Sequence, residues 1–158
     1  MVTTRKSSRP TQNYQHSMQR WLGSMGWDYF VTFNFNTHTT LESGRTTMKR
    51  FHAKLDRSLY GRNFNTLPVH DRTVFIAFPE HVESNLHYHA MLHTKNPDFT
   101  SMALKSWSSI IPSGELHIVD LKESGITDQI NISRYITKEL LKTGRNESFI
   151  LSGEFSSH

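Results

Sequence analysis

Hydrophobic and polar residues alternate with a period of two in several short stretches of this chain and follow a helical period in others. In the run LHYHAMLH at residues 86–93, apolar residues at the even positions alternate with three histidines and a methionine at the odd positions, which predicts a strand with one packed face. Ile132, Ile136 and Leu140 recur every four residues, which predicts an amphipathic helix. Over the whole chain the pattern predicts strand 29–36, helix 43–60, strand 73–81, strand 86–94, helix 100–110, strand 115–121 and helix 128–142.

This βαββαβ order, followed by one more helix, predicts an α+β fold. The simplest architecture with that order is a ferredoxin-like or RRM-like antiparallel sheet with helices on one face, and the C-terminal helix would lie across or beside the other face. Residues 1–27 are expected to form a basic arm that contains a short helix at residues 12–23. Residues 28–143 are expected to form one domain, and residues 144–158 a polar tail with little to bury.

The net charge of +4 is concentrated at the N-terminus. No acidic residue precedes Asp28, whereas Arg5, Lys6, Arg9 and Arg20 do, so the other 14 basic and 14 acidic residues cancel. Such an arm favours phosphate backbones, although a solubilising tail has the same composition. A second basic group lies in the predicted helix 43–60 and is interpreted as its solvated face without an assignment to DNA: Arg45, Lys49, Arg50, Lys54 and Arg57.

Cysteine is absent, so neither disulfides nor thiolate zinc sites can form, which suits a cytoplasmic setting. No apolar run approaches the roughly 18–20 residues of a membrane span, and no signal-peptide pattern is present at the N-terminus, so no membrane partner is expected.

Two histidines one residue apart are the first candidate for chemistry. His87 and His89 would point to the same side of a strand and could hold one divalent metal ion. The upstream run VFIAFPEHVESN resembles the partner strand of a hairpin: a turn of two or four residues would bring Glu80 to the histidine side, and a turn of three would bring His81 there. Two solvent-facing histidines on a half-exposed strand are the alternative interpretation.

Tyr135 and Lys138 are the second candidate, because residues three apart share one side of a helix. A helical tyrosine is commonly a packing residue and a helical lysine a solvated charge. Together with a metal-binding hairpin, however, the pair suggests nucleophilic attack by the phenol on a phosphate, with the lysine stabilising negative charge.

Three motifs in this order resemble those of HUH endonucleases of the rolling-circle replication initiator (Rep) type with a single catalytic tyrosine. They are YFVTFNFN at residues 29–36, PEHVESNLHYHAML at residues 79–92 and RYITKE at residues 134–139. The resemblance implies that residues 28–143 are an HUH endonuclease domain that nicks and rejoins single-stranded DNA through a 5′-phosphotyrosine. In that reading Tyr135 attacks, Lys138 assists, and Glu80, His87 and His89 hold Mg²⁺ or Mn²⁺.

The resemblance also implies partners. Single-stranded DNA from an origin or element end, such as a hairpin, would be the substrate, and Asn34, Asn36, His93 and Arg134 are weaker candidates for contacting it. By type, Phe33, Phe35, Tyr88 and Trp107 could stack on bases. The ATP-binding pattern GxxxxGK[ST] is absent, so a host or separate helicase is expected, and a single tyrosine suggests a homodimer for successive cleavages. The setting would be cytoplasmic, or nuclear for a eukaryotic virus.

Two other functions fit parts of the pattern. A non-catalytic RRM-like module that binds single-stranded nucleic acid would have the same fold, with the histidine cluster incidental. An iron oxygenase also uses two histidines and one carboxylate, but such enzymes are built on many-stranded jelly rolls, and this chain has too few strands.

Overall fold

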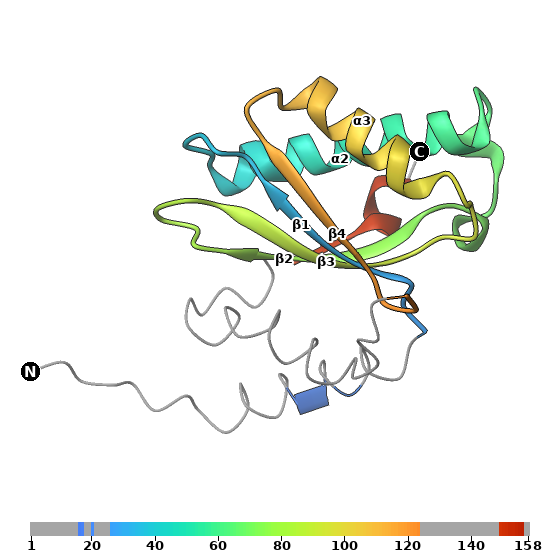
Figure 1. Ribbon diagram of the computed structural model, residues 1–158, viewed down its shortest axis with the longest axis horizontal. Helices are drawn as coiled ribbons and strands as arrows, with labels where there is room; N and C mark the ends of the chain where they lie inside the picture. Colours follow the sequence, from blue (N-terminus) through green and yellow to red (C-terminus); the bar gives the residue numbers. More distant parts are fainter. Residues whose placement is uncertain (1–15, 18–19, 21–25, 124–148, 157–158) are drawn as a thin grey trace, which may run out of the picture.

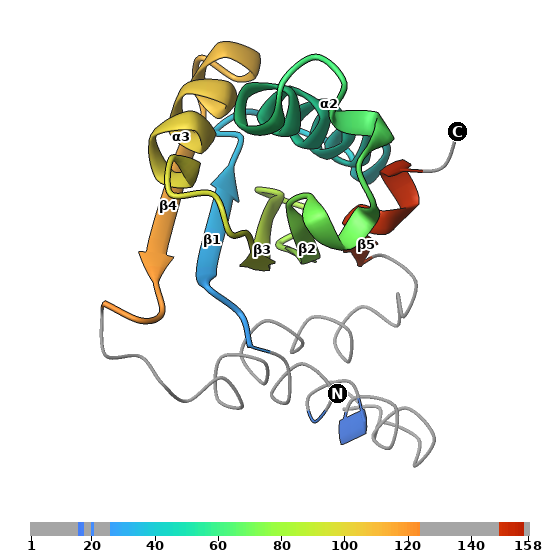
Figure 2. The same cartoon turned by 90° about the vertical axis from the view of Figure 1, so that its right-hand side faces the viewer.

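An antiparallel sheet with two helices packed on one face forms the part of the protein that the computed structural model describes, residues 16–17, 20, 26–123 and 149–156 (Figures 1 and 2). The α+β class predicted from the sequence is therefore confirmed. Neither α2 nor α3, the two long helices of the described part, is long and apolar enough to cross a membrane. The elements are β1 (Tyr29–Asn34), α2 (Leu41–Tyr60), β2 (Val74–Glu80), β3 (His87–His93), α3 (Phe99–Ile110), β4 (Glu115–Asp120) and β5 (Ile150–Leu151).

The strands lie in the order β4-β1-β3-β2-β5, and every neighbouring pair is antiparallel. β2 and β3 form a hairpin, and β1 inserts between β3 and β4, so β1 contacts β3 along its whole length. This register places Thr32 opposite His89 and Asn34 opposite His87. Residues from the beginning of the domain thus lie beside the histidine pair.

The main core lies between the sheet and the helices. Thr40 caps the N-terminus of α2, because its side chain accepts a hydrogen bond from the Ser43 amide, and the helix presents Met48, Phe51 and Leu55 to the sheet. The Phe33 ring contacts the rings of Phe51 and Trp107 edge-on, at centroid separations of 5.0 and 5.2 Å. Edge-to-face aromatic packing of this kind fixes α2 and α3 against β1.

The opposite side of the sheet, called the second face below, carries the other side chain of each alternating pair. Toward one end it is apolar, with Phe78 and Met91 buried together with Trp27 and Leu121. Toward the other end it is polar, and there it carries His87 and the residues around it. The second face therefore combines a small second core with a polar region.

The C-terminal segment differs from its expected role as a polar tail. Ile150 is 1% exposed and pairs with Ala77, so residues 150–151 add the edge strand β5 beside β2. The hydroxyl of Ser152 accepts a hydrogen bond from the Phe75 amide at 2.9 Å. Because Phe149, Ile150 and Phe155 all pack against the two cores, the expectation of little to bury is wrong for residues 149–156.

Candidate metal centre

The hairpin of β2 and β3 positions one carboxylate and two imidazoles together. Glu80 ends β2 and pairs with His87, while Phe78 pairs with His89, so all three polar side chains point to the second face. The turn between the strands is closed by the amides of Ser84 and Asn85, which both donate to the carbonyl of His81. The register is that of an even-numbered turn, which brings Glu80 rather than His81 to the histidine side.

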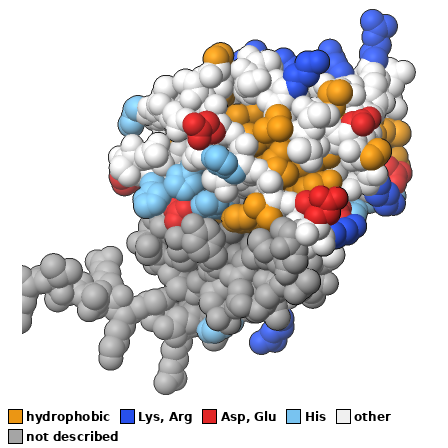
Figure 3. Space-filling model, viewed as in Figure 1, with side chains coloured by type: hydrophobic (Ala, Val, Ile, Leu, Met, Phe, Trp, Pro, Cys, Tyr) orange, Lys and Arg blue, Asp and Glu red, His pale blue; other side chains and the backbone are white. Residues whose placement is uncertain are grey.

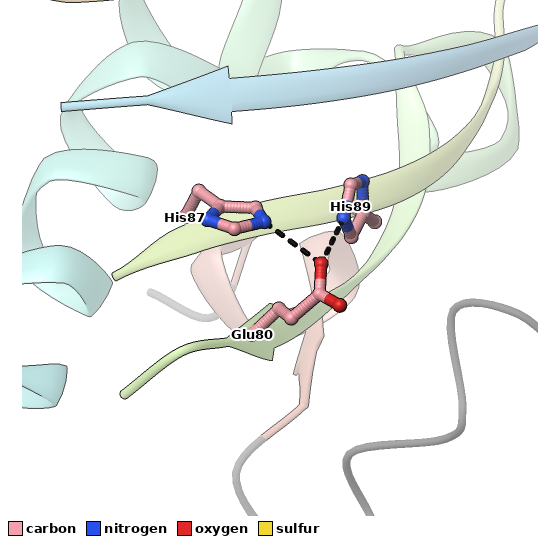
Figure 4. Close-up of side chains that lie close together, drawn as sticks. All are labelled: Glu80, His87 and His89. Atoms are coloured by element: carbon pink, nitrogen blue, oxygen red, sulfur yellow. Dashed lines mark hydrogen bonds and ion pairs between the residues drawn. The ribbon is translucent and has the colours of Figure 1, made fainter. Parts of the chain in front are cut away.

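The three side chains converge on one point (Figure 4). The Oε2 atom of Glu80 lies 2.8 Å from Nε2 of His87 and 2.5 Å from Nε2 of His89, and the three donor atoms lie within 4.8 Å of one another. Glu80 and His89 are 4% and 6% exposed, and the His87 side chain is 14% exposed. The trio is thus a nearly buried cluster that solvent reaches from the His87 side.

The other ring nitrogens are held by neighbouring groups. Nδ1 of His87 lies 3.1 Å from the carbonyl of Asn85, to which it can only donate, and Nδ1 of His89 lies 3.0 Å from the hydroxyl of Thr32. The Phe30 ring stacks on His89 at a centroid distance of 5.6 Å. A proton on Nδ1 of a neutral imidazole leaves the Nε2 lone pair free to bind a metal ion, and outer hydrogen bonds of this kind orient metal-ligating histidines.

The residues present therefore fit a divalent cation. Two imidazole nitrogens and a carboxylate oxygen suit a borderline to hard ion, and three protein ligands leave coordination positions for water or substrate.

His81 and His93 lie outside this cluster. His81 is exposed at the start of the turn with φ of +52°, and its Nε2 is 4.0 Å from the other oxygen of Glu80. His93 shares the second face, but six residues of strand separate it from His87, or roughly 20 Å. There it lies 2.6 Å from the carboxylate of Asp28 and lines a cavity of about 370 Å³ with Lys122.

The two asparagines have different positions. Asn34 lies at the end of β1 between His87 and Glu115, so it is beside the trio. Asn36 has φ of +57°, and its side-chain amide donates to the carbonyl of Ser113 at 3.0 Å. Asn36 therefore stabilises the turn that leads into β4. The sequence did not indicate this structural role of Asn36.

The proposed nucleophile and its neighbours, Arg134, Tyr135 and Lys138, lie outside the described residues. All four aromatic residues suggested for base stacking are at most 1% exposed, so this expectation is wrong: Phe33, Phe35, Tyr88 and Trp107 belong to the helix-side core. Burial also raises the pKa of the Tyr88 phenol to about 12, so Tyr88 stays protonated at neutral pH.

Three residues near the trio were missed by sequence reasoning. Thr32 contacts His89 directly and lies between His89 and His117 across the three strands β3, β1 and β4. Glu115 of β4 lies in the neighbouring row, beyond Asn34 and His87. The only signal in the sequence was the apolar and polar alternation of β1 and β4. Alternation identifies the side on which a residue lies, but the neighbour of each residue depends on strand order and register.

Comparisons with protein-family models, with curated proteins and with solved structures found no match.

Proposed function

We propose that this protein is a metal-dependent nuclease and strand transferase that nicks and rejoins single-stranded DNA through a 5′-phosphotyrosine, as in rolling-circle replication initiation or mobile-element transfer. The observation that carries the proposal is the convergence of Glu80, His87 and His89 on one buried point. The strand order β4-β1-β3-β2 with two helices on one face also supports a ferredoxin-like arrangement, the fold that the resemblance to HUH endonucleases implies.

In this proposal Glu80, His87 and His89 hold Mg²⁺ or Mn²⁺. The bound ion supplies Lewis-acid chemistry, by which negative charge on a phosphate is stabilised. Thr32 and the Asn85 carbonyl hold the imidazoles in the required orientation. The partial burial of the trio reduces competition from bulk water, and the exposed edge of His87 gives the phosphate access.

The chemical step is assigned to Tyr135. Its phenol oxygen attacks the scissile phosphorus, the bond from phosphorus to the 3′ oxygen breaks, and the phenol gives up its proton as the leaving 3′ oxygen gains one. Lys138 steadies charge on the phosphate or the leaving oxygen. Because a phosphodiester is exchanged for a phosphotyrosine diester, a returning 3′-hydroxyl can reverse the reaction without ATP.

The substrate would cross the polar end of the second face. Thr32 and Asn34 lie between the trio and the edge strand, where His117 is exposed, so hydrogen-bonding groups continue from the metal centre to the sheet edge. Such groups can position a DNA backbone. A separate helicase would supply single strands, and a homodimer would supply a second tyrosine for a second cleavage.

Trapping of covalently bound DNA tests the proposal. The protein is incubated with a pool of single-stranded oligonucleotides and Mn²⁺, and adducts are separated under denaturing conditions and sequenced. Wild-type protein and the control Tyr60→Phe should form the adduct, whereas Tyr135→Phe, His87→Ala and His89→Ala should not. An adduct with Tyr135→Phe would remove the nucleophile assignment, and full activity of both histidine variants would remove the metal assignment.

The same preparation separates the proposal from a non-catalytic RRM-like module. Such a module would bind oligonucleotides equally well with and without a chelator and would cut none of them with any metal ion. That combination of results would refute the nuclease proposal and favour the non-catalytic module.

A further inference from the structure

The solvent side of α2 is strongly basic, and the structure shows where its cations point. Every one of the five is exposed, whereas Met48, Phe51 and Leu55 on the same helix are buried in the core: Arg45, Lys49, Arg50, Lys54 and Arg57. We call this surface the α2 ridge. At 1.5 Å per residue it extends for roughly 18 Å. Figure 3 shows Lys and Arg side chains along the helical side of the molecule, away from the histidine-rich side.

Few acidic groups offset these charges. Of the two acids in α2, Glu42 is exposed at the first turn, whereas Asp56 is 0% exposed and paired with Arg72. Arg45 pairs with Glu154, and Arg57 stacks on Phe64. Within the described part of the chain no ion pair involves Lys49, Arg50 or Lys54. Among the described residues, the middle of the ridge therefore carries positive charge that no acidic side chain pairs with.

We infer that the α2 ridge binds the phosphate backbone of a nucleic-acid duplex. Cations fixed along a rigid helix suit the regular phosphates on the outside of a duplex, and neutralising them releases counterions. Binding of single strands commonly adds aromatic stacking, but the rings of Phe51, Phe99 and Trp107 are buried, and the half-buried Phe64 ring is already contacted by Arg57 and Arg72. Insertion into a membrane surface needs exposed apolar residues beside the cations, and the apolar residues of α2 face the core.

The α2 ridge is separate from the metal centre. The ridge lies on α2, which covers one face of the sheet (Figure 1), whereas Glu80 and the histidines point to the second face. A duplex held by the ridge would add a second nucleic-acid contact to the molecule. Because the contact is to phosphates, it should be independent of base sequence.

Salt-dependent binding tests the inference. Anisotropy of a fluorescent, mixed-sequence DNA duplex is measured over a range of salt concentrations in the presence of EDTA, which keeps the metal centre out of the measurement. The test variant is Arg50→Gln with Lys54→Gln. The control is Arg62→Gln with Lys95→Gln, which also removes one arginine and one lysine, but outside α2. All three proteins are first shown to have the same melting temperature.

The test variant should bind at least several-fold more weakly at low salt, and its slope of log K against log salt should be smaller by about 2, since each lost phosphate contact removes about 0.9. The control should keep the wild-type slope. An unchanged slope in the test variant, or an equal change in both variants, would overturn the inference. So would wild-type protein that binds vesicles of anionic phospholipid through Arg50 and Lys54 but does not bind the duplex.

Discussion

Thr32 shows at the residue scale how one hydroxyl can orient an imidazole of the candidate site. It contacts Nδ1 of His89 at 3.0 Å, and loss of such an outer hydrogen bond typically weakens metal binding 10- to 100-fold. In the proposed metal centre, Thr32→Val should therefore lower the affinity for Mn²⁺ by at least about 10-fold, measured by calorimetric titration, whereas Thr32→Ser should stay close to wild type. Equal affinities of the valine and serine variants would show that the contact does not orient the imidazole.

His52 is a second residue whose surroundings make a measurable prediction. Its Nε2 lies 2.9 Å from the Thr73 carbonyl and 3.2 Å from Asp56, which also pairs with Arg72. Burial is the largest influence and lowers the pKa of His52 below its ordinary value of 6.5, although Asp56 and the carbonyl oppose it. The unfolded chain then binds the proton more readily, so this contribution to stability is complete above the unfolded pKa and is lost as pH falls toward the folded one.

Acidification should therefore destabilise the wild-type protein more than His52→Gln. One proton contributes a slope of at most about 1.4 kcal/mol per pH unit, so the free energies of unfolding are compared by urea titration at about pH 7.5 and about pH 5.5. His70→Gln, which removes an exposed histidine, should follow the wild type. If the His52 variant loses as much stability as wild type between the two pH values, the imidazole is not buried in its neutral form.

At the scale of elements, Gly114 permits the turn between α3 and β4 to pack on β1. A Cβ atom at this position would lie 2.5 Å from the Asn34 carbonyl oxygen and 2.9 Å from Nε1 of Trp107. A backbone atom cannot move aside cheaply, so Gly114→Ala should destabilise the protein by about 2 kcal/mol, in the range for overpacking. Gly153→Ala is the control, because a Cβ atom added there would have no neighbour within 4 Å. Equal unfolding free energies of the two variants would contradict the close packing.

Most of the elements followed from the sequence, but their contacts did not. The alternation that predicted strands 86–94 and 73–81 is local, and β3 and β2 lie within those bounds. Glu80 and His81 remained alternatives because turn length decides which of two neighbours faces the histidines. β5 was missed because two residues are too few for a periodic pattern, and it is stabilised by pairing with β2 rather than by its own composition.

At the scale of the whole molecule, the candidate site is assembled from segments far apart in the chain. Thr32 and His89 are separated by 57 positions, and they meet because β1 inserts between β3 and β4. A histidine pair can be recognised in the sequence, and a carboxylate on the same side of the hairpin can be proposed if the turn has an even number of residues. The threonine that orients one imidazole can be found only once strand order is known, since no local pattern encodes the neighbour of a strand.

Metal binding should also couple to the stability of the whole domain, because the ligands lie on adjacent strands of one sheet. An ion that binds only the folded state at 100 times its Kd stabilises it by about 2.7 kcal/mol, which for a domain of this size raises the melting temperature by roughly 5–10 °C. Mn²⁺ should produce this shift in wild-type protein, and EDTA should reverse it. Glu80→Gln keeps the size of the side chain but removes its charge, so its melting temperature should barely respond to Mn²⁺. A cation held by two imidazoles and a neutral amide would lack the charged ligand that wild-type protein supplies. A melting-temperature shift in Glu80→Gln equal to that of wild type would therefore mean that Mn²⁺ binds elsewhere.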